Sequence, residues 1–281
     1  MGSSHNFIRA QSDKAPRPAP RSVLVTGANG RIGRAFAQTC TGRYALRLMA
    51  RPSSEGDCHL KGLGEVVMAD LKDPSALERA CAGVDAVLHL AGEASPKAPW
   101  KELHEANIVG TANLFEAASK AGCSKVVFAS SIHAVSGYPP DVQVKTDDPV
   151  NPGDLYGVSK CFGEALGRYY ALQTGMSVYA IRIGAFQSLD NARKPGSISM
   201  MDSFIAPGDM IDLFCRCLDD ESLLFGIFHG VSNNRFKRLD ISDARDLLGF
   251  EPEKDLSVEN PLLQPLHLNE AVEPDTAGGS K

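Results

Sequence analysis

The stretch LYGVSK, at residues 155–160, places Tyr156 four positions before Lys160 in a segment expected to open a helix. Residues at this spacing lie on one face of a helix, so the two side chains can reach the same point. A free phenol, with a pKa of about 10, is too weak a base at neutral pH. An adjacent ammonium group lowers that pKa and lets the phenol accept a proton from an alcohol while hydride leaves its carbon. The pair therefore suits acid–base chemistry, although any two polar residues four apart share the geometry.

A serine from a separate segment strengthens this interpretation. The run KVVFASS, residues 125–131, is typical of a strand, and the helix with Tyr156 follows it along the chain. If the two pack side by side, Ser131, Tyr156 and Lys160 surround one point, where Ser131 is expected to hydrogen-bond the reacting oxygen. Asn107, in the preceding predicted helix, either holds a water that relays protons to Lys160 or is a surface asparagine. These four are the predicted catalytic residues.

The elements that must position them follow from the hydrophobic pattern. Short, continuously apolar runs alternate with segments of helical spacing, and such runs suit strands buried on both faces of a parallel sheet. Strict alternation predicts an α/β fold, a Rossmann-like doubly wound parallel sheet that binds ligands beyond the carboxyl ends of its strands. The predicted strands are SVLVTG (22–27), ALRLMA (45–50), EVVMAD (65–70), AVLHLA (86–91), KVVFASS (125–131) and SVYAIRIG (177–184).

Composition divides the chain into four parts. Residues 1–21 are rich in Pro, Ala and Ser and are expected to form a disordered leader. Residues 22–184 form the predicted dinucleotide-binding Rossmann core. Residues 185–259 are expected to supply a small C-terminal substrate-binding lobe together with the final strand and helices. Residues 260–281, rich in Pro, Glu and Gly, are expected to be a flexible tail.

A glycine-rich loop joins the first predicted strand to the first helix. The sequence VTGANGRIGRAF carries glycines spaced G-x-x-G-x-x-G. Glycine permits a tight turn and a close approach of the backbone to a diphosphate, which the free N–H groups of the helix N-terminus then bind. Because a strand precedes the motif and an amphipathic helix follows it, dinucleotide binding is favoured over a purely structural turn. The predicted ligands here are Gly27, Asn29, Gly30, Arg31, Ile32 and Gly33.

The second strand suggests which dinucleotide is bound. An acidic residue at its end would accept the ribose 2′-hydroxyl of NAD, but the sequence there is LMARPSS, with Arg51 and no carboxylate. Arg51, together with Arg31 or Arg34, is suited to a 2′-phosphate, so NADP is favoured over NAD. The other predicted cofactor contacts are Asp70 (to the adenine amine), Leu71, Ala91, Gly92 and Ile183, with Tyr156 and Lys160 at the nicotinamide end.

Several motifs together resemble the extended short-chain dehydrogenase/reductase superfamily, also described as the NAD(P)-dependent epimerase/dehydratase family. They are TGANGRIG, HLAG, Ser131 and YGVSK, and the resemblance covers about residues 22–255. Within that superfamily, VVFASSIHAVSGYP, LYGVSKCFGE, IRIG and LGFEPEKD are similar to uronate dehydrogenases. The resemblance implies oxidation of a uronate at C1 to an aldarolactone with NAD, Tyr156 as base, Ser131 as oxygen ligand and substrate loops at 93–100 and 185–205. It also implies a homodimer paired through two long helices.

The chain departs from uronate dehydrogenases at substrate positions. Ile132 stands where they have asparagine, Ala185 where they have serine, and GSISMMDSF lacks their carboxylate-binding arginine, although Arg193 and Lys194 lie just before it. A buried carboxylate without a cationic partner is costly, so these departures argue against a uronate but not against the reaction type. The predicted substrate contacts are Ser95, Ser131, Ile132, His133, Tyr156 and Ala185. His89, within an apolar strand, is expected to be a core histidine.

Composition restricts partners and location. The net charge of −5 and pI near 5.8 give no reason to expect nucleic acid. No apolar run approaches the roughly 20 residues that span a bilayer, and no secretory signal is visible. The seven scattered cysteines suit free thiols in a reducing compartment, with no metal-ligand spacing. A cytoplasmic protein acting on a small molecule is predicted, with no membrane, nucleic-acid or metal partner.

Three functions remain open on this scaffold. The first is an NAD(P)-dependent oxidoreductase acting on a sugar-like or small alcohol substrate. The second is a nucleotide-sugar epimerase or dehydratase, which the short segment after IRIG disfavours because it leaves a small lobe for a whole sugar nucleotide. The third is a dinucleotide-binding regulator, which would have no need for Ser131, Tyr156 and Lys160 together.

Overall fold

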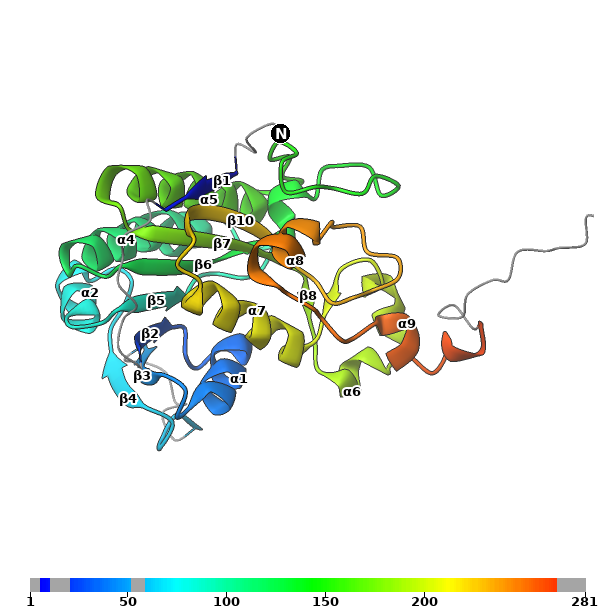
Figure 1. The fold of residues 1–281 in the computed structure, drawn as a ribbon, viewed down its shortest axis with the longest axis horizontal. Helices are drawn as coiled ribbons and strands as arrows, with labels where there is room; N and C mark the ends of the chain where they lie inside the picture. Colours follow the sequence, from blue (N-terminus) through cyan, green and yellow to red (C-terminus); the bar gives the residue numbers. More distant parts are fainter. Residues whose placement is uncertain (1–5, 11–20, 52–58, 267–281) are drawn as a thin grey trace, which may run out of the picture.

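The six predicted strands are present and belong to one eight-stranded sheet (Figure 1). The structure is a computed structural model that describes residues 6–10, 21–51 and 59–266. The strand order is β1-β10-β7-β6-β5-β2-β3-β4, and neighbouring strands pair parallel except for β1 on β10. The strands are β1 (Phe7–Arg9), β2 (Ser22–Thr26), β3 (Ala45–Ala50), β4 (Glu65–Met68), β5 (Ala86–His89), β6 (Lys125–Ser131), β7 (Ser177–Ile183) and β10 (Leu223–Gly230). The doubly wound α/β fold is confirmed.

Helices cover both faces of this sheet. Figure 1 shows α2, α4 and α5 on one face and α1 and α7 on the other. The helices are α1 (Arg31–Cys40), α2 (Pro74–Cys81), α3 (Trp100–Leu103), η2 (His104–Val109), α4 (Gly110–Lys120), η3 (Ile132–Val135), α5 (Leu155–Thr174), α6 (Leu189–Ala192), η4 (Pro195–Met200), α7 (Pro207–Asp219), α8 (Ser242–Leu248), α9 (Leu256–Glu259) and η5 (Gln264–Leu266). Every residue of β6 and β7 is buried, as expected of strands covered on both sides. Within the described ranges, no helix is long and apolar enough to span a bilayer.

The two helices nearest the predicted site have distinct local features. The long helix predicted after residue 99 is continuous but contains a π-helical stretch, η2, between α3 and α4. Such stretches are rare and often lie at functional sites. Helix α5 begins at an N-cap, where Asp154 accepts a hydrogen bond from the Gly157 amide at 2.7 Å. It ends at Gly175, whose φ of 73° is the left-handed conformation that stops a helix.

The two ends of the chain correct the predicted boundaries. The expectation of a disordered leader is wrong for residues 7–9, which form β1 and pair with β10 at the sheet edge. Residues 1–5 and 11–20 lie outside the described residues. The tail was expected from residue 260, but Asn260 is buried and donates to the carbonyl oxygens of Ala192 and Lys194, at 2.9 and 3.0 Å. Residues 267–281 lie outside the described part of the chain.

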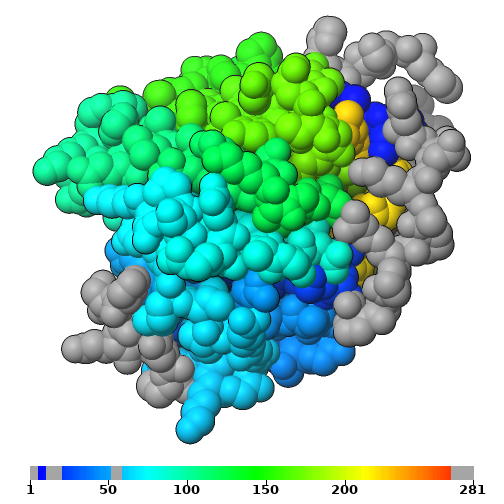
Figure 2. Space-filling model, turned by 90° about the vertical axis from the view of Figure 1, so that its left-hand side faces the viewer, coloured from blue at the N-terminus to red at the C-terminus, as the bar shows by residue number. Residues whose placement is uncertain are grey.

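The predicted lobe is built from two separate segments. Residues 207–230 form α7, which packs on α1, and β10, which joins the main sheet beside β7. The lobe therefore consists of the stretch with β8 (Ala185–Phe186), α6, η4 and β9 (Phe204–Ile205), together with the segment after β10. In Figure 1 it lies at the right-hand end, with α6 and α9 together. Figure 2 views the opposite end, where the orange and red of the last segment are not visible.

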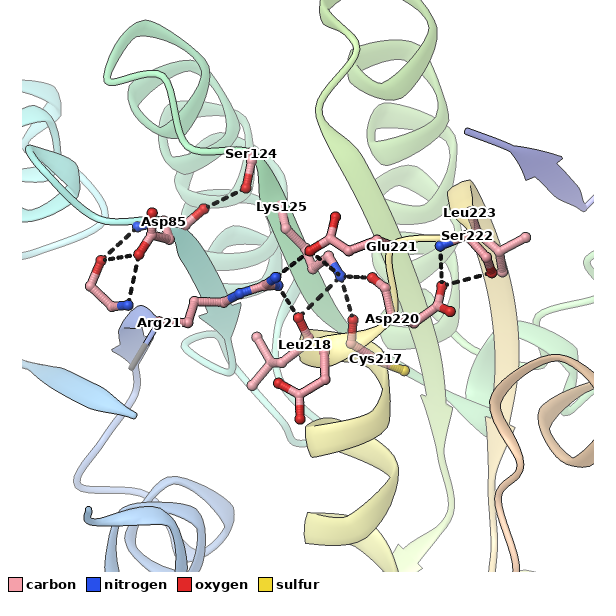
Figure 3. A network of polar contacts seen from close by, with 12 residues as sticks. Arg21, Asp85, Ser124, Lys125, Cys217, Leu218, Asp220, Glu221, Ser222 and Leu223 are labelled. Carbon is pink, nitrogen blue, oxygen red and sulfur yellow. Dashed lines mark hydrogen bonds and ion pairs between the residues drawn. The ribbon is translucent and has the colours of Figure 1, made fainter. Parts of the chain in front are cut away.

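A buried lysine secures the end of the sheet away from the lobe (Figure 3). Lys125, the first residue of β6, is 1% exposed, and its Nζ donates to the carbonyl oxygens of Cys217 and Leu218 at 3.0 and 3.1 Å. These carbonyls end α7, where a cation is favourable. Burial lowers the pKa of Lys125 to about 8. Strand β6 is thus anchored to α7 at one end and carries Ser131 at the other.

Candidate active site

The glycine loop is packed too tightly for side chains. Gly27 has a φ of +67°, and a Cβ there would lie 2.8 Å from the Ala91 amide nitrogen. A Cβ on Gly33 would lie 2.4 Å from the Gly27 carbonyl oxygen. The N-cap of α1, Gly30, supplies no side-chain hydrogen bond to the first turn, so the amides of that turn are left to bind an anion. This loop fits the diphosphate of a dinucleotide.

Gly33→Ala tests the loop. The added methyl group must displace the backbone at residues 27 and 28, so we expect the free energy of unfolding to fall by about 1–3 kcal/mol and cofactor affinity to weaken. Urea titration and a cofactor fluorescence titration measure the two effects. Gly208→Ala, in the first turn of α7, is the matched control because a Cβ there meets open space. Equal behaviour of the two variants would contradict the proposed role of the loop.

Thr26, a residue that the sequence analysis did not select, fixes the loop that follows β5. Its Oγ1 accepts hydrogen bonds from the amides of Leu90 and Ala91, both at 3.1 Å, and lies 2.8 Å from His89 Nδ1. His89 is buried, as expected of a core histidine, and burial followed by the charge of Lys160 lowers its pKa to about 3. The sequence did offer a signal for Thr26, because it is a polar residue at the end of a buried strand, directly before the glycine loop.

The other predicted cofactor residues occupy the expected strand ends. Asp70 follows β4 and accepts a hydrogen bond from the Lys72 amide at 2.9 Å. Leu71 is buried beneath Gly110, and Ile183 is the buried last residue of β7. Arg31, at the start of α1, reaches the lobe, with Nη1 3.5 Å from the Phe186 carbonyl oxygen. The remaining contacts stand as predictions.

Two of these predictions concern the ends of β3 and β5. Arg51 directly follows β3 and is exposed, and residues 52–58 beyond it lie outside the described ranges. Gly92 follows β5, where a Cβ would lie 2.7 Å from Asn107 Oδ1 and 3.9 Å from Lys160 Nζ. The backbone at Gly92 therefore passes directly beside the predicted catalytic lysine, as the strand order requires. Asn29 lies in the turn of the glycine loop, and Ile32 packs against the core.

The structure brings Ser131, Tyr156 and Lys160 together. Ser131 ends β6, Tyr156 and Lys160 lie in the first turns of α5, and the three are 5%, 8% and 8% exposed. Tyr156 hydrogen-bonds Ser131. Lys160 Nζ lies 5.5 Å from the centre of the Tyr156 ring and donates to the Ala129 carbonyl oxygen at 2.9 Å. The three functional groups thus share one small, nearly dry space.

The electrostatics of this space correct one expectation. Burial raises the pKa of Tyr156, the hydrogen bond with Ser131 opposes that rise, and the charges of Asp154 and Glu93 add to it. Burial also lowers the pKa of Lys160 to about 8. The net shift of the phenol pKa is therefore upward, opposite to the expected lowering, because loss of hydration is its largest cause.

Asn107 is not on the surface, and its side chain is bound within the protein. It is buried in η2, its Oδ1 accepts from the Glu93 amide at 2.8 Å, and its Nδ2 donates to the Glu93 carbonyl oxygen and to Ser159 Oγ, both at 2.9 Å. Both N–H donors are thus committed within the protein. The side chain ties the loop after Gly92 to α5, so the surface interpretation is wrong and the water relay stays a prediction.

The predicted substrate residues are placed unevenly around this centre. His133 presents its ring edge-on to Tyr156, with centroids 5.3 Å apart, and its amide donates to Ser131 Oγ at 3.2 Å. Ile132 packs instead against the cluster of Val135, Val144, Val231, Leu239 and Ile241. Ala185 begins β8 in the lobe, and Ser95 is exposed, with Oγ accepting from the Lys97 amide at 3.2 Å.

Arg193 and Lys194, the two cations just before the loop that lacks the carboxylate-binding arginine of uronate dehydrogenases, already have partners. Arg193 Nη2 lies 3.3 Å from Glu259 Oε2, and its Nη1 lies 3.7 Å from Asp190 Oδ1. Lys194 Nζ donates to Asn191 Oδ1 at 2.7 Å. These side chains hold α6 and its neighbours together, and none is paired toward the Tyr156 centre. Neither Arg193 nor Lys194 therefore takes the place of the carboxylate-binding arginine that the sequence lacks in this loop.

Known proteins share both the sequence and the fold. A model of the NAD dependent epimerase/dehydratase family matches residues 23–206. NAD-dependent glucose-6-phosphate dehydrogenase of Haloferax volcanii is 36% identical over 246 residues, 82% of this chain and 92% of that protein. L-arabinose 1-dehydrogenase (NAD(P)(+)) of the same organism is 31% identical over 252 residues, 82% of this chain and 95% of that one. The crystal structure of uronate dehydrogenase from Agrobacterium tumefaciens has a TM-score of 0.74 and 30% identity, covering 92% of each chain.

These matches confirm the resemblance inferred from the glycine loop and the YGVSK motif. The family match spans the strand, loop and helix of the predicted diphosphate site as well as Ser131, Tyr156 and Lys160. The relatives cover most of the described chain, lobe included. The chain is a member of the NAD-dependent epimerase/dehydratase family.

Proposed function

We propose that the protein is an NAD(P)-dependent dehydrogenase that oxidises a hydroxyl group of a sugar. The observation that carries the proposal is the convergence of Ser131, Tyr156 and Lys160 beside the backbone at Gly92. This set orients an alcohol and removes its proton. The relatives named above act, by their names, on glucose 6-phosphate, L-arabinose and uronates, which supports a sugar as substrate.

The residues of the chain divide the reaction between them. When bound, the nicotinamide supplies the acceptor for hydride. Ser131 donates a hydrogen bond to the substrate oxygen and keeps it in line with Tyr156. Tyr156 takes the hydroxyl proton, and the charge of Lys160 stabilises the resulting phenolate. Because burial raises the pKa of Tyr156, the phenolate is scarce at neutral pH, and oxidation should accelerate as the pH rises.

An uncharged sugar fits the lobe better than a uronate. Arg193 and Lys194, which lie just before the loop that lacks the arginine of uronate dehydrogenases, are bound to Glu259 and Asn191, and Arg31 contacts the Phe186 carbonyl oxygen at 3.5 Å. A carboxylate placed near Ala185 would therefore have to break an existing pair or remain unpaired, and either is costly. We place aldoses first among the substrates, with uronates second and sugar phosphates as a third class.

A substrate panel tests the proposal. Aldoses, uronates and sugar phosphates are supplied with NAD or NADP, and reduced cofactor is followed by its absorbance. Substrate-dependent reduction with one class is the expected result. Interconversion of a nucleotide sugar without net cofactor reduction would indicate the alternative epimerase. Tight cofactor binding without any turnover would favour a regulator.

Cofactor choice is tested at Arg51. We propose that this residue, which directly follows β3 next to the expected adenosine ribose, favours NADP through its charge. Arg51→Asp should shift the ratio of kcat/KM values from NADP toward NAD by about tenfold or more, since a carboxylate repels a 2′-phosphate and accepts a ribose hydroxyl. Arg193→Asp is the control, because that arginine belongs to the lobe. An unchanged ratio would remove the argument for NADP.

A homodimer paired through α5 is also proposed. Apolar residues recur along this helix at alternating spacings of three and four, and all are exposed except the half-buried Phe162: Leu155, Val158, Phe162, Ala165, Tyr169 and Leu172. Such a stripe on one helix suits packing against another helix. Sedimentation equilibrium should show a dimer, and Leu172→Glu should yield a monomer. A monomeric wild-type protein would end this proposal.

A cytoplasmic location is proposed because of the state of the cysteines. Cysteines of the described ranges lie mostly buried, at positions 40, 81, 123, 215 and 217. Free buried thiols are usual in a reducing compartment. Fractionation of cells that express the full chain tests this, with recovery alongside cytoplasmic markers as the expected outcome.

A further inference from the structure

One carboxylate joins the catalytic helix to the histidine beside the catalytic tyrosine. Asp154 caps α5, with Oδ1 accepting from the Gly157 amide at 2.7 Å. Its second oxygen, Oδ2, lies 2.7 Å from His133 Nδ1. Both side chains are partly exposed, at 27% and 30%. The same group therefore orients the first turn of the Tyr156 helix and the imidazole of His133.

The contact decides which nitrogen of His133 carries the proton. An ionised carboxylate can only accept hydrogen bonds, so the proton between Asp154 and His133 belongs to Nδ1. In the neutral imidazole, Nε2 is then the bare nitrogen, a hydrogen-bond acceptor. Within the described residues, no hydrogen bond to His133 Nε2 is formed. The free acceptor is thus available to a ligand.

The position of this acceptor is rigid. The His133 ring meets the Tyr156 ring edge-on at 5.3 Å, and the His133 amide is bound to Ser131 Oγ. A Cβ on Gly157 would lie 2.2 Å from the His133 carbonyl oxygen, so α5 and η3 are in direct backbone contact. The backbone of His133 cannot shift without moving the helix that carries Tyr156, and the imidazole on it is held by Asp154 Oδ2.

We propose that Asp154 is a positioning residue that fixes His133 in the Nδ1–H tautomer. His133 Nε2 then accepts a hydrogen bond from a second hydroxyl of the sugar whose first hydroxyl is deprotonated by Tyr156. This inference rests on the proposed sugar dehydrogenase function and adds the origin of its selectivity for polyhydroxylated substrates. A substrate with no second hydroxyl cannot use the acceptor.

Asp154→Asn separates this role from the capping role. Asparagine caps helices as well as aspartate, but its amide must donate to His133 Nδ1. That reverses the tautomer, so Nε2 can no longer accept the hydroxyl proton and the hydroxyl must turn to accept from Nε2–H instead. We expect KM for the sugar to rise by up to about tenfold, the effect of one lost hydrogen bond, with kcat, the unfolding midpoint and cofactor Kd little changed.

Two further variants and one spectrum complete the experiment. Asp73→Asn is the matched control, since Asp73 caps α2 through the Ala76 amide at 3.0 Å and should leave KM unchanged. Asp154→Ser keeps the cap without contacting the imidazole and secures the test if the asparagine variant folds poorly. The ¹⁵N shifts of the His133 imidazole should show Nδ1–H in the wild type and Nε2–H in Asp154→Asn.

The outcomes are distinguishable. An Nε2–H tautomer in the wild type would overturn the inference whatever the activity. A reversed tautomer with an unchanged KM would overturn the selectivity role while leaving the proposed function intact. If the wild type oxidises no sugar, the proposed function fails and the selectivity role fails with it, while the spectrum still reports on the Asp154–His133 pair.

Discussion

Tyr156→Phe is expected to lower sugar oxidation by a factor of about 10²–10⁴, the usual contribution of a general base. Phenylalanine keeps the ring, its burial and its edge contact with His133 and removes only the hydroxyl that hydrogen-bonds Ser131. Cofactor affinity should stay nearly constant, because the diphosphate loop is untouched. Initial rates and a cofactor titration on the same preparation measure both quantities.

The pH profile provides a second measurement of the same variant. Burial raises the pKa of Tyr156, so the wild-type rate of oxidation should increase toward alkaline pH as the phenol ionises, and this increase should be absent in the variant. Tyr169→Phe, on the same helix but 57% exposed, is the control and should behave as wild type. If Tyr156→Phe retained normal rates, the base would have to be another group.

Arg182→Met is expected to reduce the free energy of unfolding by about 3–5 kcal/mol. Arg182, on β7, binds Glu164, on α5, through two hydrogen bonds of 2.9 Å, and the side chains are 1% and 4% exposed. Ser130 Oγ donates to the same carboxylate at 2.6 Å. Removing the guanidinium leaves a buried, unpaired carboxylate, which costs more than the intact pair contributes. Urea unfolding measures the loss.

Two controls define the cause of this loss. The double variant Arg182→Met with Glu164→Gln should recover much of it, because no buried charge remains. Lys120→Met removes exposed ion pairs with Glu116 and Glu78 and should leave the midpoint unchanged, since water and salt screen such pairs. Equal effects of the buried and the exposed substitution would contradict this account. Because Glu164 lies on the helix of Tyr156 and Lys160, activity should fall together with stability.

The sequence was informative where local pattern determines structure. The apolar runs at 22–27, 125–131 and 177–184 predicted buried parallel strands, and β2, β6 and β7 follow them within a residue. The spacing of Gly27, Gly30 and Gly33 predicted a tight loop that the backbone contacts confirm. Chain order alone placed Ser131 beside the helix of Tyr156.

Long-range contacts were beyond the reach of that pattern. The edge strand β1 was taken for disorder, because its three residues pair with β10 more than 200 positions away. The sequence analysis expected Asn107 either on a helix surface or as the ligand of a water. Nothing in the sequence around it indicates that Glu93 and Ser159 bind its side chain. Asp154 was not selected from the sequence, although its second oxygen binds His133.

By itself, the sequence determined the alternation of strands and helices, the tight glycine loop and the choice of Ser131, Tyr156 and Lys160 as the predicted catalytic groups. These depend on residue type and spacing, which local sterics and hydrophobic periodicity translate directly into structure. Only the tertiary structure decided the position of β10 in the sheet, the partners of Asn107 and Asp154, and the direction of the Tyr156 pKa shift. Burial and pairing depend on which distant segments meet, and a phenol beside a lysine becomes more or less acidic according to how much water both have lost.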